Sequence, residues 1–374
     1  MTSVTSQHAN SQPESSQLTP TLTGHDYSSD EVFGRERERI FHRSWFYVCR
    51  ADRMSAGDRF VADVAGESVL VVRDRDGLIH AHANVCRHRG ARLCEESGPG
   101  SKAGITCPYH AWTYSLDGRL IGTPHLAADE IDRDSLSLWS VACEVWQGFV
   151  FVNLSAEPIS LLDWFASGMD SAQRFEHLRL DELHTAVTTS TDVRANWKIL
   201  VENYQECLHC SWVHPELVDL VPLYKTGSVV DPTREDGGVT IRGNSFSITG
   251  RSSLPVLPHM PADESESYYG ATVFPNMFID ITGTCVIVSS MWPKGADSTT
   301  VVMEYLFAPE TIAAAGFDPS EIVEFSELVG KQDYDVSERV QRGVSSRYFD
   351  HGVLAPQDHL IVDFLATYRS QMTD

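Results

Sequence analysis

The chain has 374 residues, which is long enough for two domains and a sizeable buried core. Asp and Glu number 52 against 29 Lys and Arg, for a formal charge of -23, so nucleic acid is not expected as a partner. No apolar run of about 18 residues could span a bilayer and no signal peptide is recognisable, so we expect a cytoplasmic protein without a membrane partner. The 8 cysteines, irregularly spaced, do not suggest a disulfide framework and become candidate metal ligands.

The first part of the chain predicts a tail, a helix and a small β domain. Residues 1–24 are rich in Ser, Thr and Gln and predict a disordered tail. An amphipathic helix is expected from Asp30 to about Tyr47, with Ser28 or Ser29 as its N-cap. Short apolar runs separated by Asp-Gly turn signals between Arg59 and Leu154 predict an all-β domain.

Beyond residue 160 the pattern changes to longer helical and strand-like segments. Helices are predicted near Leu162–His177, Ala195–Cys210, Pro319–Arg342 and Gln357–Met372, and strands at Val239–Ile248, Thr272–Pro293 and Thr299–Phe307. This pattern predicts an α+β domain with an antiparallel sheet. We place the first domain, including its helix, at residues 25–160 and the second at residues 161–374.

Two Cys–His pairs lie in the first domain. Cys86 and His88 form a C-x-H pair, and Cys107 and His110 follow as C-x-x-H, each expected at the tip of a hairpin. Two thiolates and two imidazoles can hold a tetrahedral zinc ion, or a [2Fe-2S] cluster in which the cysteines bind one iron and the histidines bind the other. The identity of the ligands alone leaves both alternatives open.

A second group of candidate ligands lies on a predicted helix of the second domain. Glu206 and His209 are three residues apart and share a helix face, and His214 follows five residues later. Because Pro215 biases the preceding residue away from the helical conformation, both imidazoles can turn toward one ion at the helix end. Two histidines and one carboxylate form the ligand set of non-haem Fe(II) oxygenases, which leaves positions for oxygen and substrate.

These motifs resemble those of one enzyme family. The stretches C-R-H-R-G-A-R-L-C and C-P-Y-H-A-W-T-Y-S-L-D-G resemble the Rieske domain of ring-hydroxylating oxygenases, and N-W-K-x-x-x-E-N-Y-x-E-x-x-H-x-x-x-x-H resembles their catalytic domain. The resemblance implies a Rieske [2Fe-2S] cluster on the four cysteine and histidine ligands and a helix-grip catalytic domain. It also implies a mononuclear Fe(II) held by His209, His214 and a late aspartate.

The resemblance assigns roles to two acidic residues. For the late aspartate, the stretch Gln332-Asp333 fits the family better than Asp335 or Glu338 does. Glu206 stands where the family has an acidic residue that links an iron-bound histidine to a cluster-bound histidine of the neighbouring subunit. Such a link implies a homotrimer at minimum.

The resemblance also implies an activity. Such a chain is the terminal component of an oxygenase that hydroxylates a small molecule with O2, and it receives electrons from NADH only through a separate flavin and iron–sulfur reductase. The stretches Y-Y-G-A-T-V-F-P-N-M-F-I-D-I and V-Q-R-G-V-S-S-R are similar to the branch that oxidises choline, glycine betaine, carnitine or proline betaine. Six aromatic side chains are candidates to face a trimethylammonium group: Trp212, Tyr268, Phe274, Phe278, Trp292 and Tyr305.

Two other hypotheses stay open at this point. One is an oxygenase that acts on an aromatic ring, and the other is a zinc-stabilised interaction protein in which His209, His214 and Asp333 do not converge. Cys207 and Cys210 form a C-x-x-C, which we interpret as buried free cysteines beside the metal helix rather than as a zinc or redox pair.

Overall fold

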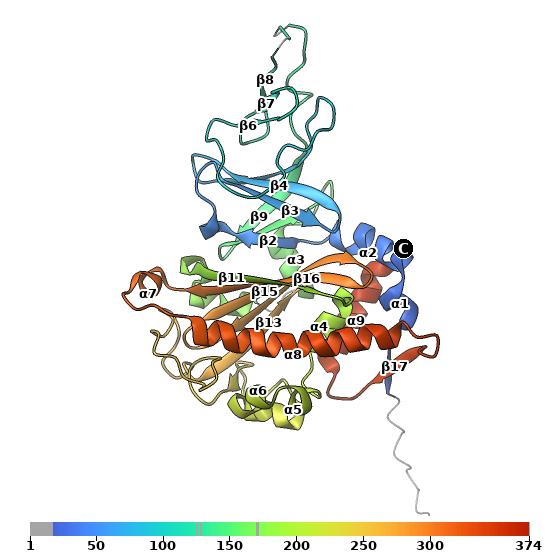
Figure 1. The fold of residues 1–374 in the computed structure, drawn as a ribbon, viewed down its shortest axis with the longest axis vertical. Helices are drawn as coiled ribbons and strands as arrows, with labels where there is room; N and C mark the ends of the chain where they lie inside the picture. The colour runs from blue at the N-terminus through green and yellow to red at the C-terminus, as the bar shows by residue number, and fades with distance from the viewer. Residues whose placement is uncertain (1–17, 125, 128, 170–171, 374) are drawn as a thin grey trace, which may run out of the picture.

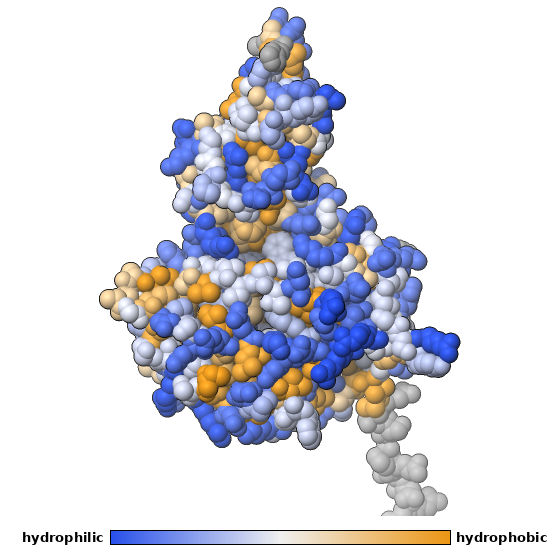
Figure 2. Space-filling view, in the orientation of Figure 1, coloured by the Kyte–Doolittle hydropathy of each residue, from blue (hydrophilic) through white to orange (hydrophobic). Residues whose placement is uncertain are grey.

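The computed structural model describes residues 18–124, 126–127, 129–169 and 172–373. Figure 2 shows a narrow part standing on a broader body, and in the ribbon the narrow part contains the strands of the first domain (Figure 1). Its six-stranded antiparallel sheet has the order β2-β10-β9-β5-β4-β3. These strands are β2 (Phe46–Arg50), β3 (Arg59–Val64), β4 (Glu67–Arg73), β5 (Ile79–Ala83), β9 (Ser140–Trp146) and β10 (Phe149–Asn153).

A smaller sheet forms the far end of the first domain. It consists of β6 (Ile105–Thr106), β7 (Thr113–Tyr114) and β8 (Leu120–Gly122). Both Asp-Gly signals lie at turns, where Gly77 and Gly118 have φ angles of 87° and 92°. At Gly118 a Cβ atom would lie 2.7 Å from His82 Cε1, so glycine is required there for space as well as for conformation. The all-β character of this domain is confirmed.

The second domain is built on another six-stranded antiparallel sheet, with the order β11-β16-β15-β14-β13-β12. Its strands are β11 (His184–Val193), β12 (Val239–Thr240), β13 (Ser267–Val273), β14 (Met277–Ile281), β15 (Val286–Gly295) and β16 (Ser298–Phe307). The long helix α8 (Ser320–Val344) lies across this sheet (Figure 1), and its Ile322 packs in one apolar cluster with Tyr305 and Phe307 of β16. The predicted α+β class is confirmed.

Shorter helices complete the second domain. They are α3 (Leu161–Trp164), α4 (Trp197–Tyr204), α5 (Cys210–Val213), α6 (Pro215–Leu220), α7 (Pro309–Ala313) and α9 (His359–Met372). The chain also forms short π-helical segments, η1 (Arg37–Phe41) and η3 (Phe165–Met169). Its short 3-10 helices are η2 (Ala51–Arg53), η4 (Gln173–Leu178), η5 (Leu180–Glu182) and η6 (Pro222–Thr226). Among the described helices, none has both the length and the apolar character needed to cross a bilayer.

Several predicted elements differ from the structure. Of the predicted helices at Leu162–His177 and Ala195–Cys210, α3 ends at Trp164 and α4 ends at Tyr204, and the predicted strand at Thr272–Pro293 divides among β13, β14 and β15. The predicted strand at Val239–Ile248 is wrong beyond β12, because the chain turns at Gly243, which has a φ of 121°, and the Asn244 N–H donates to Gly250 O at 3.0 Å. The predicted helix from Asp30 ends at Phe41, and β2 begins at Phe46. Ser29 caps this helix by accepting from the N–H groups of Glu31 and Val32, as its sequence position predicts.

The N-terminal segment also contacts the second domain. Of the predicted tail, residues 1–17 lie outside the described residues, whereas β1 (Thr19–Thr23) pairs with β17 (His351–Leu354). The helices α1 (Gly24–Ser28) and α2 (Asp30–Glu36) follow, and Tyr27 Oη donates to Glu202 Oε1 on α4 at 2.8 Å. Residues 19–28 therefore lie on the domain that carries α4.

A buried ion pair joins three helices of this assembly. Lys198 Nζ on α4 lies 2.5 Å from Glu36 Oε1 on α2, and neither side chain is exposed. Burial lowers the pKa of Lys198 and the Glu36 carboxylate opposes this effect. Glu36 also accepts from Trp197 Nε1 and from Tyr368 Oη on α9, both at 2.8 Å. The pair thus fixes the start of α4, the helix that leads into the candidate site.

Replacing Glu36 by Gln should destabilise the protein strongly. The substitution leaves the Lys198 ammonium buried without its counter-ion, so the free energy of unfolding should fall by about 3–5 kcal/mol in guanidinium titrations followed by tryptophan fluorescence. The matched control is Glu38→Gln, two residues away and exposed, for which we expect a change within about 0.5 kcal/mol. Equal effects of the two substitutions would contradict a stabilising role for the pair.

Candidate functional site

The two predicted Cys–His pairs lie on two turns with the same hydrogen-bond pattern. One turn joins β5 to β6 and carries Cys86 and His88, and the other joins β6 to β7 and carries Cys107 and His110. In each turn the cysteine N–H donates to the carbonyl five residues further on, and the N–H four residues further on donates to the cysteine carbonyl. These four bonds measure between 2.8 and 3.1 Å. Each turn therefore offers one sulfur and one imidazole in an equivalent setting.

The donors separate into a buried sulfur pair and an imidazole pair nearer the surface. Cys86 and Cys107 are each 2% exposed, and Tyr114 Oη lies 3.3 Å from Cys86 Sγ. The rings of His88 and His110 have centroids 4.6 Å apart, and His88 is exposed. His110 Nδ1 is buried and has no hydrogen-bond partner among the described residues. A buried unpaired imidazole nitrogen is costly unless a metal occupies it, so this donor set fits a bound metal group.

The spacing of these donors favours a cluster over a single zinc ion. Zn–S and Zn–N bonds of about 2.3 and 2.1 Å would bring all donor atoms around one ion to within about 4 Å of each other. Of the residues that the structure describes, those that meet within 4.8 Å as a group of three or more lie in the second domain, and the Cys–His set is not among such groups. A [2Fe-2S] cluster spreads its sulfur and nitrogen ligands over two irons and suits this arrangement.

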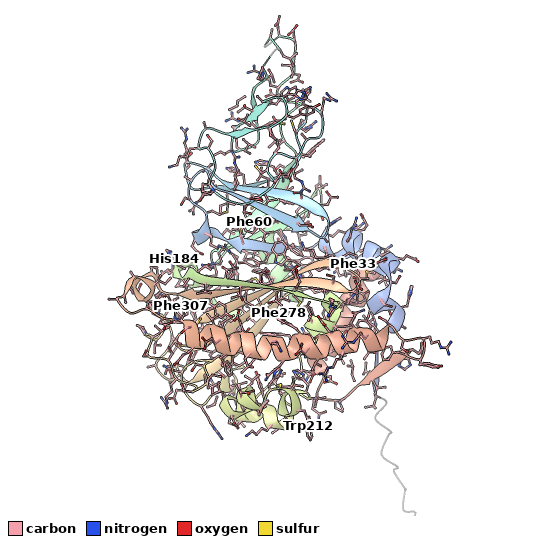
Figure 3. The ribbon with its side chains drawn as sticks, viewed as in Figure 1. Phe33, Phe60, His184, Trp212, Phe278 and Phe307 are labelled. Atoms are coloured by element: carbon pink, nitrogen blue, oxygen red, sulfur yellow. A yellow bond between two sulfur atoms is a disulfide. The ribbon has the colours of Figure 1, made fainter. Side chains whose placement is uncertain are left out.

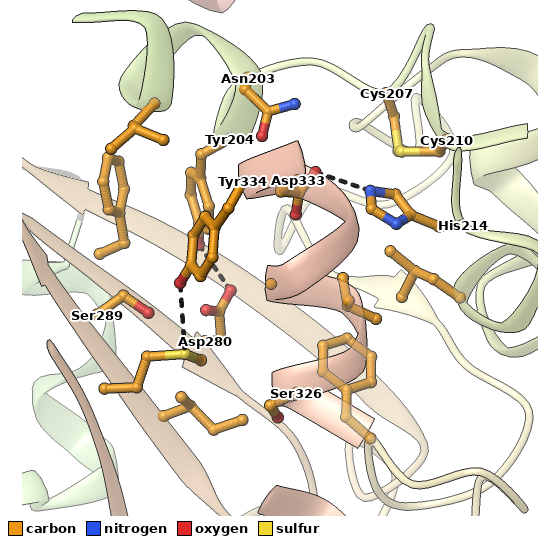
Figure 4. Close-up of a pocket in the computed structure, with 18 of the residues that line it drawn as sticks. Asn203, Tyr204, Cys207, Cys210, His214, Asp280, Ser289, Ser326, Asp333 and Tyr334 are labelled. Carbon is orange, nitrogen blue, oxygen red and sulfur yellow. Dashed lines mark hydrogen bonds and ion pairs between the residues drawn. A yellow bond between two sulfur atoms is a disulfide. The ribbon is translucent and has the colours of Figure 1, made fainter. Parts of the chain in front are cut away.

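The second domain brings His209, His214 and Asp333 together, as predicted. Asp333 Oδ1 lies 2.8 Å from His214 Nε2 (Figure 4). It lies 3.3 Å from His209 Nε2, and the two Nε2 atoms are 3.2 Å apart. His209 precedes α5, His214 lies between α5 and α6 with Pro215 at the first position of α6, and Asp333 projects from α8. The three donor atoms form the two-histidine, one-carboxylate set of non-haem iron sites.

The alternative carboxylates on α8 point elsewhere. The Asp335 side chain is 60% exposed and pairs with Lys331, while Glu338 pairs with Arg194 on the surface. Among the described acidic side chains of this helix, Asp333 is thus the one that joins the histidines.

The expectation that Glu206 and His209 share a helix face is wrong, although the two side chains do meet. α4 ends at Tyr204, and Gln205 leaves the helical conformation. The Glu206 carboxylate accepts from the N–H of Leu208 and lies 2.5 Å from His209 Nδ1. Glu206 therefore orders a tight turn between two helices, because its side chain bonds backbone groups that no longer have helical partners.

Each imidazole is oriented by an oxygen atom that contacts its Nδ1, the ring nitrogen that does not face Asp333. His209 Nδ1 faces Glu206, and His214 Nδ1 lies 2.7 Å from Gln332 Oε1, whose Nε2 donates to Glu216 at 3.2 Å. Such partners fix the tautomer and direct Nε2 toward the metal position. The role of Gln332 was not predicted; its place directly before Asp333 on a helix was the available signal.

The three groups shift each other's ionisation. Burial alone lowers the pKa of His209, but hydrogen bonds to Asp333 and Glu206 outweigh it and raise the pKa to about 9. Burial raises the pKa of Asp333, and the two histidines reverse this and hold it below its usual value. Without metal, a proton on His209 therefore supplies positive charge beside the carboxylates of Asp333 and Glu206.

A cavity of about 180 Å³ opens beside the triad. Figure 4 shows it between the sheet and α8, with Asp333 on one side and Asp280 of β14 on the other. Its aromatic lining consists of Tyr204, Tyr224, Phe246, Tyr268, Phe278 and Tyr334. Tyr204 stacks on Phe278 with ring centroids 4.1 Å apart, and Phe246 lies 4.8 Å from Tyr268. The volume suits one small molecule, since engineered cavities of roughly 150 Å³ hold benzene.

Two of the six aromatic residues singled out from the sequence line this cavity. They are Tyr268 and Phe278, and Figure 3 places Phe278 inside the second domain and Trp212 at its outer edge, where Trp212 is 90% exposed. The other three, Phe274, Trp292 and Tyr305, lie outside the cavity lining. No role was predicted for Tyr204 or Tyr334, although Tyr204 stands in the histidine motif and Tyr334 directly follows Asp333.

Cys207 and Cys210 are joined in a disulfide, so their interpretation as free cysteines is wrong. The turn that leads into α5 brings their Cα atoms to 4.9 Å, which lies within the range that a disulfide requires. Both residues line the cavity, as does His209.

Comparisons with known proteins agree with these two sites. The family profile described as ring hydroxylating alpha subunit (catalytic domain) matches residues 180–374, and that described as Rieske [2Fe-2S] domain matches residues 44–142. The chain is 27% identical to the glycine betaine monooxygenase oxygenase subunit of Pseudomonas aeruginosa, over 92% of this chain and 87% of the relative. It is 28% identical to the carnitine monooxygenase oxygenase subunit of Escherichia coli, over 87% of this chain and 85% of the relative.

A solved structure of a quaternary ammonium Rieske monooxygenase is also similar. The two share 26% of their sequence with a TM-score of 0.80, over 95% of this chain and 96% of the other. The Rieske match and the converging triad exclude the zinc-stabilised interaction protein.

Metal binding at the triad should release a proton. Since His209 of the metal-free site keeps its proton up to a pH of about 9, a divalent ion must displace that proton at neutral pH. The affinity for Fe(II) should therefore rise with pH and level off above about pH 9. Calorimetric titration without air at about pH 7, in buffers of different ionisation heat, should give about one proton released per ion. A proton count near zero would contradict this protonation state.

Proposed function

Because this chain belongs to the family of ring hydroxylating alpha subunits, we propose that it is the oxygenase component of a Rieske monooxygenase acting on an N-methylated ammonium compound. The observation that carries the proposal is the convergence of His209, His214 and Asp333 on the wall of a small aromatic cavity. The chain is an iron-dependent oxygenase with a Rieske [2Fe-2S] cluster and a mononuclear iron, and it takes electrons from a reductase.

Different residues would bind the two metal groups. Cys86, His88, Cys107 and His110 would hold the cluster, and His209, His214 and Asp333 would hold the iron. When bound, the cluster supplies single electrons and the iron supplies activation of O2 for insertion into a C–H bond. Glu206 and Gln332 keep the two imidazoles oriented, and the apolar lining excludes water from the substrate.

The aromatic lining supports an ammonium substrate. The faces of Tyr204, Tyr268 and Phe278 carry negative charge density that attracts a quaternary ammonium group. Hydroxylation of an N-methyl group gives a hemiaminal, which breaks down to formaldehyde and the demethylated amine. The two relatives named above act on glycine betaine and on carnitine, which belong to the same chemical class.

Electrons are proposed to pass between neighbouring subunits. The Cys–His turns around β6 and β7 lie at the opposite end of the molecule from α5 (Figure 1). A head-to-tail homotrimer would place the cluster of one subunit beside the triad of the next, with Glu206 as the link. A flavin and iron–sulfur reductase that uses NAD(P)H is the proposed electron source, which makes the cytoplasm the proposed location.

The reaction is tested with the anaerobically purified holoenzyme, a flavin reductase, NADH and O2. Choline, glycine betaine and carnitine are supplied in turn, with naphthalene as the aromatic alternative. We expect formaldehyde and consumed O2 in equal amounts with at least one N-methylated compound. Oxidation of naphthalene without formaldehyde from any ammonium compound would contradict the proposal.

Asp333→Ala and Asp335→Ala form a matched pair for the iron site. Losing Asp333 removes a ligand, so turnover should drop by more than about 100-fold while the visible absorption of the cluster persists. Asp335→Ala removes an exposed carboxylate from the same helix and should keep turnover within about twofold. Loss of activity in both, or in neither, would refute Asp333 as the ligand.

Transfer between subunits is tested by complementation. Chains with Cys107→Ala lack the cluster, and chains with Asp333→Ala lack the iron, so each alone should be inactive. Co-expressed with different tags and purified as mixed oligomers, they should regain activity, because an intact cluster then meets an intact triad. Separately purified variants mixed just before the assay are the control. Mixed oligomers without activity would point to transfer within one chain.

A further inference from the structure

A buried carboxylate in the substrate cavity has no part in the metal sites. Asp280 lies on β14, and its Oδ1 accepts hydrogen bonds from Tyr204 Oη at 2.6 Å and from Tyr268 Oη at 2.7 Å. The residue is partly exposed although it lies deep inside the second domain, and it lines the cavity, so the exposed part faces the cavity. Figure 4 shows its carboxylate between the sheet and α8.

Among the described residues, this carboxylate has no cationic partner. The described residues that line the cavity include no lysine and no arginine, and Asp280 forms no ion pair with any described basic side chain. Burial raises the pKa of Asp280, and the hydroxyls of Tyr204 and Tyr268 oppose that rise. A buried carboxylate of this kind costs free energy unless a positive charge accompanies it.

The iron does not supply that positive charge. The two charges of a ferrous ion are matched by Asp333, which would bind it, and by Glu206, which contacts His209. Asp280 then remains as one uncompensated negative charge in a cavity of about 180 Å³. Any substrate in so small a space is close enough to feel this charge.

We propose that Asp280 is a specificity residue that selects a cationic ammonium substrate without a carboxylate, such as a quaternary ammonium alcohol, over a zwitterionic betaine. The inference rests on the proposed function and narrows its substrate class. A betaine would bring its own carboxylate into a cavity that already holds Asp280 and offers no arginine or lysine to receive it. Tyr204 and Tyr268 already donate to Asp280, so their hydroxyls are not free to bind that carboxylate.

The same cavity suits the alcohol end of such a cation. Asn203 and Ser289 are neutral polar side chains on the cavity wall, and each can hydrogen-bond a hydroxyl without a charge. The ammonium group would lie among the aromatic faces with Asp280 as its counter-charge. This differs from the relatives named above, whose glycine betaine and carnitine are zwitterions.

The test measures binding to the holoenzyme by calorimetry without O2. Three ligands of similar shape are compared: choline as the cation, glycine betaine as the zwitterion and 3,3-dimethyl-1-butanol as the uncharged analogue of choline. We expect choline to bind at least about tenfold more tightly than either of the others. This comparison uses the unaltered protein, so it decides the matter even if a variant does not fold.

Asp280→Asn tests the residue itself, since it removes the charge and keeps the shape. The variant should bind choline at least about tenfold more weakly, bind 3,3-dimethyl-1-butanol as before and bind glycine betaine as well as or better than the unaltered protein. The control is Asp219→Asn, whose side chain is 71% exposed and lies outside the cavity lining, and which should change none of the three affinities.

Three outcomes overturn the inference. Glycine betaine binding as tightly as choline, or an Asp280→Asn variant with an unchanged preference, refutes Asp280 as the selecting charge. If formaldehyde is still released from an N-methylated compound in these cases, the proposed function stands and only the inference fails. If none of the ammonium compounds binds or is demethylated, the proposed function fails and the inference fails with it.

Discussion

Asp333 Oδ1 and His214 Nε2 lie 2.8 Å apart although 119 residues separate them in the chain, and the rest of the site depends on this contact. The turn between α5 and α6 positions His214, and Pro215 is the first residue of α6. Asp333 is set by α8, a helix of 25 residues held against the sheet. Because neither element alone offers more than part of a ligand set, the iron site exists only when the whole second domain is folded.

The structure around the site fixes the position of α4, the helix that leads into it. Lys198 and Glu36 anchor α4 to the N-terminal helices, and the end of α4 carries Asn203 and Tyr204 into the cavity. Asn203 Nδ2 lies 3.4 Å from His209 Nε2, while Tyr204 bonds Asp280. The helix α4 thus contacts the proposed metal ligand His209 through Asn203 and the substrate cavity through Tyr204. Charge within the cavity is accordingly fixed by the fold rather than by flexible side chains.

The convergence of His209, His214 and Asp333 could be predicted from the sequence, whereas the surroundings of these residues could not, for a physical reason. Cys86, His209 and their partners stand in short motifs that resemble those of one enzyme family, and the strands were predicted from local apolar runs. Asp280 reaches the cavity through the pairing of β14 with β13 and β15, which no local pattern encodes. The turn at Gln205 and the Cys207–Cys210 disulfide escaped for a similar reason, because a helical pattern continues past the point where tertiary contacts end the helix.

One chain holds a Rieske cluster and a separate mononuclear iron. The most direct measurement is the EPR spectrum of protein purified without air and reduced with dithionite, together with its iron, zinc and sulfide content. We expect a red-brown protein with a Rieske-type signal, about three irons and about two sulfides per chain. A colourless zinc protein that stays colourless after cluster reconstitution would rule out both metal groups.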